Sequence, residues 1–177
     1  MHKQYGDILI REAAPGDAEQ LCLWWNDGSV MAHAGFPLGL GITVETVRAQ
    51  LAEKGRSVRH VIEHQGMLIG EMNYRLTDAP DTCEIGIKIC DASRQNRGLG
   101  KVILSLFIRT LFDELGFRRI ILDTNLNNLR AQHVYEQLGF RKVRVNTDSW
   151  TDQLGRKQSS VDYELTKENF IDFTRRA

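Results

Sequence analysis

The sequence predicts a single domain of mixed α/β (α+β) type that spans residues 1–177. In several short segments apolar residues alternate with polar ones, as in strands, while in others they recur at the three- and four-residue spacing of helices. These segments follow one another in the order β-α-α-β-β-β-α-β-α-β-β, with no repeat or linker between them. At 177 residues the chain is long enough to bury a sizeable core.

The first third of the chain predicts a strand and two helices around a long loop. The segment that begins at Pro15 has an acidic first turn and helical apolar spacing, and the second helix has possible N-caps at Thr43 and Thr46. The stretch between them is rich in glycine, which is typical of a loop. The expected elements are a strand over 7–12, a helix over 15–27, a loop over 28–42 with some helix at 30–34, and a helix over 43–55.

The rest of the chain predicts a β-meander and then alternating helices and strands. Two alternating segments meet at Gln65 and Gly66, which predicts a hairpin, and Gly139 ends the last main helix. The expected elements are strands over 57–64, 67–78 and 82–91, a helix over 98–116, a strand over 118–125, a helix over 127–139, a hairpin over 141–150 and 159–166, and a tail helix over 167–176.

Charge and composition argue against several classes of partner. Lys plus Arg equals Asp plus Glu at 23 each, and the sequence has no long basic face, so we expect no attraction to nucleic acid. No window approaches the ~18 apolar residues of a membrane span, and we expect a cytoplasmic protein. We expect no metal site, because the cysteines and histidines match no ligand spacing. Cys22, Cys83 and Cys90 lie on expected helices or strands, which favours buried free thiols over redox or nucleophilic roles.

The stretch RQNRGLGKVILSLF (94–107) places two glycines among three cations where a strand passes into an apolar helix. The first amides of a helix have no intrahelical partner, so bare backbone and local positive charge there predict a phosphate or pyrophosphate site. Val102 follows Lys101 where the mononucleotide loop needs Ser or Thr, and Ile103 replaces the third glycine of the dinucleotide fingerprint. A flexible helix entry with surface arginines is the alternative.

Two motifs carry a family resemblance. QNRGLG (95–100) resembles the Q/R-x-x-G-x-G/A loop of the GCN5-related N-acetyltransferase (GNAT) superfamily, and LDTNLNNLRAQHVYEQLGF (122–140) resembles its strand-then-helix segment. The matching positions in the second motif are Asn128, Ala131, Tyr135, Glu136, Gly139 and Phe140. The resemblance implies the GNAT fold, a mixed and mostly antiparallel sheet with a splayed parallel strand pair and flanking helices.

The resemblance also implies acetyl-CoA as co-substrate. Its pyrophosphate would lie on the glycine loop, and its pantetheine arm would run between the splayed strands EIGIKIC (84–90) and IILDTN (120–125). The implied contacts are Lys88, Ile89 and Cys90 on the strand, Gln95, Asn96, Arg97, Gly98, Leu99, Gly100 and Lys101 on the loop, and Asn128 and Tyr135 on the later helix.

Helix geometry places some of these residues on one face. At ~100° per residue, Asn128, Ala131 and Tyr135 share a sector, whereas Arg130 and His133 point elsewhere. Tyr135 resembles the family's general acid, which gives a proton to the departing thiolate, and Asn128 the amide that bonds the pantetheine arm. A tyrosine packed in the core, with its hydroxyl bonded to backbone, is the alternative.

Amide formation also requires a neutral amine. A Lys-like amine has a pKa near ~10.4, so at neutral pH it usually needs a base or a desolvating pocket to lose its proton. Glu84 resembles the catalytic glutamate of histone-type family members and is the first candidate for the base, with a surface or hydrogen-bonding role as the alternative. Glu71 and Asp123 are weaker candidates, and His133 points away from Tyr135. Some family members use no dedicated base.

The amine acceptor is expected to bind to the first third of the chain and the last hairpin. Candidates are Trp24, Trp25, His33 and Phe36 as cleft residues and Asp27, Asp148 and Asp152 as cation partners, although the tryptophans fit core positions equally well.

We therefore expect an acyltransferase that moves an acetyl group from acetyl-CoA to a primary amine of an aminoglycoside, polyamine or metabolite by direct attack. The alternatives are a protein N-terminal acetyltransferase of ribosomal-protein type and a non-catalytic acyl-CoA binding or sensing module. A homodimer is left open.

Overall fold

The computed structural model describes residues 1–53, 55–95 and 98–175. Its strands are β1 (His2–Tyr5), β2 (Ile8–Glu12), β3 (Ser57–His64), β4 (Met67–Leu76), β5 (Thr82–Ile89), β6 (Arg119–Asn125), β7 (Arg141–Thr151) and β8 (Lys157–Thr166). Its α-helices are α1 (Ala18–Asn26), α2 (Gly28–Met31), α3 (Val44–Ala52), α4 (Leu99–Asp113) and α5 (Leu129–Gln137). Short 3-10 helices are Pro15–Asp17, Ala32–Ala34, Ala92–Arg94 and Lys167–Asn169.

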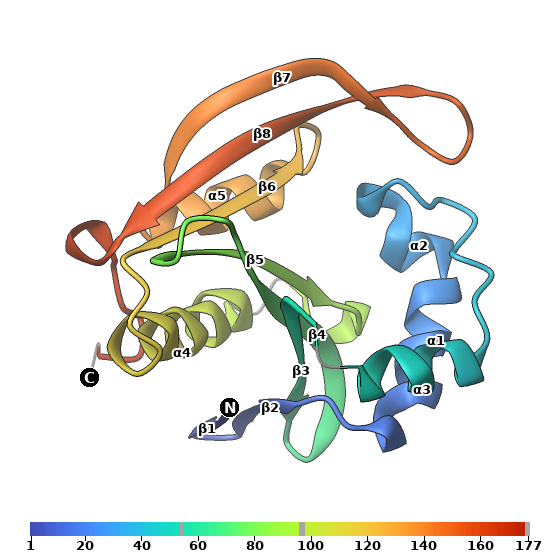
Figure 1. Cartoon of the computed structure of the whole chain (residues 1–177), viewed down its shortest axis with the longest axis horizontal. Helices are drawn as coiled ribbons and strands as arrows, with labels where there is room; N and C mark the ends of the chain where they lie inside the picture. The colour runs from blue at the N-terminus through green and yellow to red at the C-terminus, as the bar shows by residue number, and fades with distance from the viewer. Residues whose placement is uncertain (54, 96–97, 176–177) are drawn as a thin grey trace.

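The strands form one sheet in the order β1-β2-β3-β4-β5-β6-β8-β7. Within the described part of the chain, β5 and β6 are its only parallel neighbours, and their register pairs 82–84 with 119–121 and goes no further. Both strands continue, to Ile89 and to Asn125, so they separate beyond this short stretch (Figure 1). The predicted sheet, mostly antiparallel with a splayed parallel pair and flanking helices, is confirmed.

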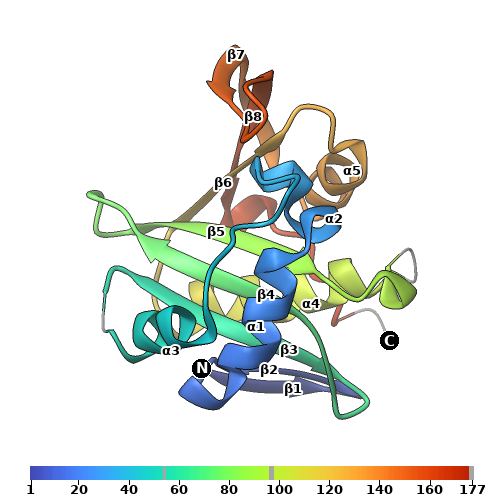
Figure 2. The ribbon, with the colours of Figure 1, turned by 90° about the vertical axis from the view of Figure 1, so that its right-hand side faces the viewer.

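Helices cover both faces of the sheet and divide the core in two. In Figure 2, α1 and α3 lie in front of β3 and β4, and α4 lies behind them. Alternation along the strands produces this division, since on β3 Val61 packs with α1 and α3 while Ile62 packs with α4. α5 joins the α4 side through Tyr135 and through Leu138, the C-cap that follows it.

Turns and caps lie where local signals predict them. The β3–β4 hairpin turns through Gln65 (φ 54°) and Gly66 (φ 74°), two left-handed residues that match the twist of the strands. Thr43 caps α3 by accepting a hydrogen bond from the amide of Thr46 at 3.3 Å. Gly139 follows α5 with φ 94°, and a Cβ there would overlap the carbonyl of Asn169, so glycine is required.

The chain ends differ from the sequence-based expectation. β1 was not expected, because this mostly exposed four-residue edge strand has no apolar alternation. The predicted tail helix over 167–176 is wrong for the described residues, where one 3-10 turn is followed by non-helical chain. Phe170 and Phe173 have the spacing of a helix, but they pack against the core from an irregular segment.

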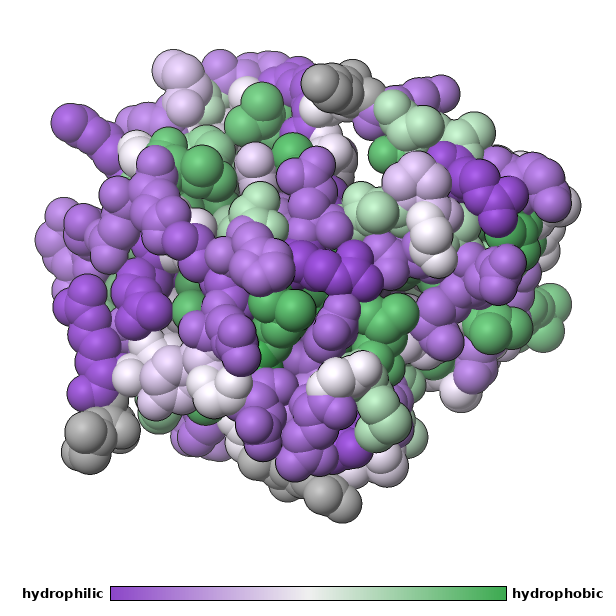
Figure 3. Space-filling view, turned by 90° about the horizontal axis from the view of Figure 1, so that it is seen from below, coloured by the Kyte–Doolittle hydropathy of each residue, from purple (hydrophilic) through white to green (hydrophobic). Residues whose placement is uncertain are grey.

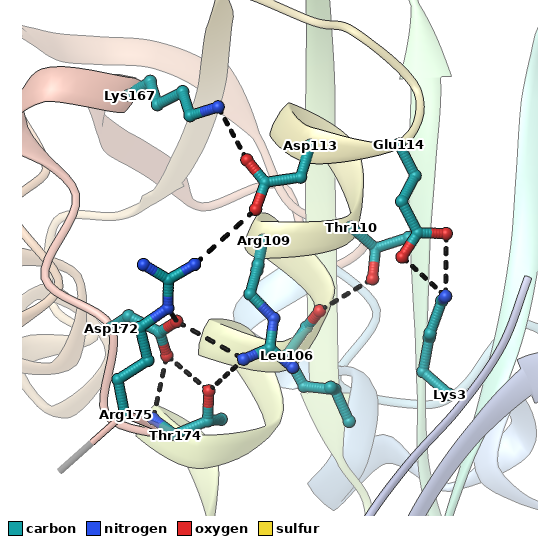
Figure 4. A network of polar contacts seen from close by, with 10 residues as sticks. All are labelled: Lys3, Leu106, Arg109, Thr110, Asp113, Glu114, Lys167, Asp172, Thr174 and Arg175. Atoms are coloured by element: carbon teal, nitrogen blue, oxygen red, sulfur yellow. Dashed lines mark hydrogen bonds and ion pairs between the residues drawn. The ribbon is translucent and has the colours of Figure 1, made fainter.

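This C-terminal segment lies along α4. The amide of Phe173 donates to Oγ of the buried Ser105 at 3.0 Å. Figure 4 shows a second bond, in which Arg109 Nη1 donates to Thr174 Oγ1 at 2.8 Å. The ammonium group of Lys101 lies 4.8 Å from the ring centroid of Phe173. The tail therefore contacts the first turns of α4, next to the glycine loop.

One face of the molecule is mainly polar (Figure 3). The face in Figure 3 carries hydrophilic residues over most of its area, with apolar groups scattered among them. None of the helices in the described ranges combines the length and apolarity needed to cross a bilayer.

His60 is a buried polar residue on the α4 side of β3. Its ring lies 5.4 Å from that of Phe107 and 5.9 Å from that of Tyr74. Neither ring nitrogen has a hydrogen-bonding partner among the described residues. Burial, with a smaller effect of the positive N-terminal amino group, lowers the pKa of His60 to about 4.

We predict that His60→Phe flattens the pH dependence of stability. The folded state excludes a proton that the unfolded state binds below about pH 6.5, so wild-type stability should fall from that pH toward pH 4. This should remove about 2 kcal/mol from the free energy of unfolding between pH 7.5 and 5, and the variant should retain that amount. Urea unfolding at both pH values measures the difference, and parallel losses in the two proteins would contradict the prediction.

Candidate active site

A cavity of about 590 Å³ follows the gap between β5 and β6. Residues 85–89 of β5 and 123–125 of β6 line it, so it begins where the strands stop pairing. The start of α4, one side of α5, the α2 region and Trp150 of β7 supply the remaining walls. The candidate site thus lies in the middle of the sheet and brings together segments distant in sequence.

The glycine loop opens α4 toward this cavity. Gly98 is the N-cap with φ 76°, and no side chain of the described residues caps the helix by a hydrogen bond, so within this part of the chain its first amides are left for another acceptor. Among the described residues, a Cβ at Gly100 would meet Ile89 Cδ1 alone, at 3.7 Å, which is an ordinary contact. The packing of the protein therefore does not demand glycine at 100, and the backbone there is open to approach. The predicted contacts Asn96 and Arg97 lie outside the described residues.

Gln95 joins the loop to α5. Its Nε2 donates to the carbonyl of Ile89 at 2.8 Å, and its Oε1 accepts from Arg130 Nη1 at 2.7 Å. Arg130 lines the cavity, which the helical wheel did not indicate. A wheel describes the direction of Cβ, whereas an arginine in the first turn of a helix can reach well outside its own sector.

The β4–β5 ladder determines which amides of β5 face the gap. The amide of Cys90 donates to the carbonyl of Ile69 at 2.8 Å, so it is already bonded to β4. Along an antiparallel strand, successive residues direct their amides alternately to one side and the other. The amide of Lys88, two residues before Cys90, therefore also points toward β4, and the amides of Ile87 and Ile89 point toward the gap. The sequence-based set named Ile89 but missed Ile87, since the hydrogen-bonding parity of a strand cannot be read from residue types.

Tyr135 lines the cavity from α5 with 7% of its surface exposed. Its ring packs against Phe140 and Tyr163, with centroids 5.7 and 5.9 Å away. Tyr135 is thus part of the core, as in the alternative, but no hydrogen-bonding partner of its hydroxyl, backbone or side chain, occurs among the described residues. Burial and then the charge of Asp123 raise the pKa of Tyr135 to about 12, which keeps the phenol protonated.

Asn128 also lines the cavity but has a local structural role. It is the N-cap of α5, where its Oδ1 accepts from the amide of Ala131 at 3.3 Å. Its Nδ2 approaches Thr124 Oγ1 at 3.5 Å. Capping explains an asparagine at this position without a ligand.

Of the carboxylates considered for the base, Asp123 is the one that lines the cavity. Glu84 lies at the paired end of the strands, outside the lining, and forms an ion pair with Arg75. Glu71 is 2% exposed and bonded to Trp25, Arg59 and Lys88. Burial alone would raise the pKa of Glu71, but the two cations and the indole lower it, so this carboxylate stays charged.

The cysteine thiols are buried and free. Burial raises the pKa of Cys83 and of Cys90 to about 12, the latter with help from Glu71. Both stay protonated near neutral pH and are therefore poor nucleophiles. In the described part of the chain, no group of three or more His, Cys, Asp or Glu side chains could hold a metal ion.

The residues predicted to surround the amine acceptor lie in different parts of the structure. His33 lines the cavity, together with Trp150, which the sequence did not indicate. Trp24 and Trp25 belong to the core under α1. The other candidates are Asp27, which caps α2, Asp152, which is bonded within the β7–β8 turn, and the exposed Phe36 and Asp148.

Gln153, at the tip of the β7–β8 hairpin, ties that hairpin to the loop after α2. Its amide donates to the carbonyl of Gly35 at 2.8 Å, and its side chain accepts from the amide of Leu38 and donates to the carbonyl of Gly39, each at 2.9 Å. A Cβ at Gly35 would lie 2.5 Å from the Trp150 ring. These contacts join the two segments beside His33 and Trp150, and we call them the bridge.

Comparison with known proteins assigns the chain to a family. The sequence model of the acetyltransferase (GNAT) domain matches residues 7–141. The chain therefore belongs to the GNAT acetyltransferase family and is an acyltransferase, which confirms the resemblance in its motifs. No curated protein sequence matches it.

Solved structures share the fold at low identity. The chain is similar to spermidine N-acetyltransferase from Vibrio cholerae in complex with CoA and spermine, with TM-score 0.81 and 19% identity over 93% of this chain and 98% of that one. It is also similar to a GNAT acetyltransferase from Bacillus anthracis, with TM-score 0.79 and 20% identity over 95% and 99%. A third, from Streptococcus pneumoniae, has TM-score 0.74 and 22% identity over 90% and 99%.

We predict that Gly35→Ala destabilises the protein by about 2–4 kcal/mol. A left-handed alanine costs about 1 kcal/mol, and overlap with the Trp150 ring adds about 1–3 kcal/mol. Gly41→Ala is the matched control, because this glycine of the same loop has φ +64° and nothing within 4 Å of an added Cβ. Chemical unfolding should show a loss near 1 kcal/mol for the control. Equal losses in the two variants would contradict the contact.

Proposed function

We propose that the protein transfers the acetyl group of acetyl-CoA to a primary amine of a small molecule by direct attack. The observation that carries this proposal is the inner edge of β5, which loses its strand partner in the same cavity into which the uncapped start of α4 opens. An extended arm with a pyrophosphate at one end requires these two features side by side. GNAT members use acetyl-CoA, and the Vibrio cholerae neighbour holds CoA.

The residues present fit such a ligand. The amides of Leu99, Gly100 and Lys101 are first-turn donors suited to a pyrophosphate, and the open backbone at Gly100 allows close approach. The edge of β5 offers the amides of Ile87 and Ile89 to an amide-bearing arm. The amides of Lys88 and Cys90 both point toward β4, so we leave both residues out of the proposed amide contacts.

Tyr135 is the proposed general acid. Tyr135 lines the cavity and its protonated hydroxyl has no protein partner among the described residues, so we assign it as the donor to the sulfur as the carbon–sulfur bond breaks. The buried, protonated thiols of Cys83 and Cys90 favour direct attack over an acyl-enzyme. Neither thiol is among the residues that line the cavity.

The bridge favours a small acceptor over a protein N-terminus. It joins the hairpin to the loop after α2 by the three hydrogen bonds of Gln153, beside His33 and Trp150. A polypeptide laid across this side would have to displace those bonds. Polyamines are one class to test, given the spermine-bound neighbour from Vibrio cholerae.

Thiol release from acetyl-CoA, measured with the full chain, tests the proposed function. The panel should contain polyamines, aminoglycosides, small metabolic amines and N-terminal peptides. We expect release with at least one small amine. Release with peptides alone would favour the protein N-terminal acetyltransferase. No release despite tight binding of CoA in calorimetry would favour the sensing module.

We predict that Tyr135→Phe lowers kcat about 100-fold or more, because the sulfur loses its proton donor. Thermal stability should change little, since the hydroxyl has no partner among the described residues. Tyr163→Phe is the matched control: this hydroxyl lies outside the cavity lining and donates to Glu136 at 2.9 Å. The control should keep kcat and lose about 1 kcal/mol of stability. Unchanged kcat in Tyr135→Phe would exclude the assigned role.

A further inference from the structure

The proposed transfer needs a group that takes a proton from the incoming ammonium ion, and one side chain in the cavity is placed for this task. We propose that Asp123 is the catalytic residue that accepts this proton, and that its carboxylate draws a protonated primary amine into the cavity. The proposal rests on the proposed acetyl transfer.

Sheet register places Asp123 at the point where the strands part. Glu84 pairs with Ile121, so the same register continued by two residues would set Asp123 beside Gly86, but pairing has ended there. Both residues line the cavity. Gly86 has no side chain, and a Cβ there would lie 2.9 Å from Asn73 Oδ1, so the side chain of Asn73 reaches over Gly86 from β4. The carboxylate of Asp123 therefore lies at the start of the gap, with no residue of β5 paired beside it.

Asp123 and Tyr135 approach this gap from opposite faces of the sheet. Leu122 packs into the core under α4 and α5, so its neighbour Asp123 points to the other face, where α1 and α2 lie. Tyr135 comes from the α5 side. An amine can thus enter beside the carboxylate while the leaving sulfur meets the phenol, so that the proton acceptor and the proton donor are on different sides of the reacting carbon.

The charges around Asp123 favour proton uptake. Asp162 is directly opposite on β8 and Glu84 is nearby on β5. These two carboxylates have cationic partners, Arg144 and Arg75 respectively, whereas Asp123 has no ion-pair partner among the described residues. Asp123 is exposed to solvent, but partial desolvation, then Glu84, then Asp162 raise its pKa, and Arg75 opposes them.

The proton steps balance. The ammonium ion gives one proton to the Asp123 carboxylate and becomes a neutral amine. The nitrogen lone pair then bonds to the thioester carbonyl carbon, the carbon–sulfur bond breaks, and the sulfur takes the phenol proton of Tyr135. The second proton lost from nitrogen restores the phenol through solvent. Asp123 releases its proton to water before the next turnover, so the products are the amide, a free thiol and one proton.

Asp123→Asn tests the proposal with the full-length protein and a series of primary alkylamines whose pKa is lowered stepwise by fluorine substitution. With an amine of pKa near ~10.4, about one molecule in a thousand is neutral at pH 7.5 without help. We expect the variant to lose about 100-fold or more in kcat/KM with that amine. The loss should shrink below about tenfold as the amine pKa approaches the assay pH, and a higher pH should restore activity.

The variant Glu84→Gln shows which of the two carboxylates, Glu84 or Asp123, is the base. If Asp123 is the base, this variant should keep the acidic limb of kcat/KM against pH but move it to lower pH, because one negative charge beside Asp123 is gone. Asp123→Glu should restore part of the rate. A stronger loss in Glu84→Gln than in Asp123→Asn, or an Asp123→Asn defect independent of amine pKa, would overturn the proposal while leaving acetyl transfer intact. A wild-type protein inactive with every amine would overturn both.

Discussion

The structure depends on a strand edge placed in the middle of a sheet. β5 and β6 pair over three residues and then separate, although each strand continues. Backbone donors and acceptors exposed in this way must find partners in side chains, water or a ligand. One of them, the carbonyl of Ile89, is bonded to Gln95, and the amides of Ile87 and Ile89 face the gap. The gap thus leaves unpaired strand edges in the middle of the sheet, where a strand is absent.

Every other part of the candidate site is arranged around this gap. α4 begins beside it with uncapped amides, and the C-terminal tail packs along the first turns of that helix. α5 brings a protonated phenol from one face, and β6 presents a carboxylate on the other. A chain with equal numbers of acidic and basic residues cannot attract a charged ligand by its net charge. Recognition must therefore come from these local groups.

Sequence patterns predicted most of the fold because its main elements have strong local signals. The hairpin at Gln65 and Gly66, the cap at Thr43 and the glycine that ends α5 are all local features. β1 and the C-terminal tail escaped prediction, since an exposed edge strand has no apolar pattern and the spacing of two phenylalanines imitates a helix.

The candidate site was less predictable, for geometric reasons. Motifs led to the glycine loop and Tyr135, but which amides of β5 are free follows from its pairing with β4. Arg130 reaches the cavity because its side chain is long, and Trp150 because the hairpin folds back toward Gly35. Asp123 differs from Glu84 in its position relative to the end of strand pairing, a property of register that the residue types do not contain.

Residue-resolved amide hydrogen exchange, measured by NMR with and without CoA, tests the central claim most directly. The account predicts that CoA slows exchange at Ile87, Ile89, Leu99, Gly100 and Lys101, and leaves Cys90 unchanged because its amide is already bonded to Ile69. Binding of CoA without added protection at Ile87 and Ile89, or protection centred on a surface outside the gap, would contradict the account.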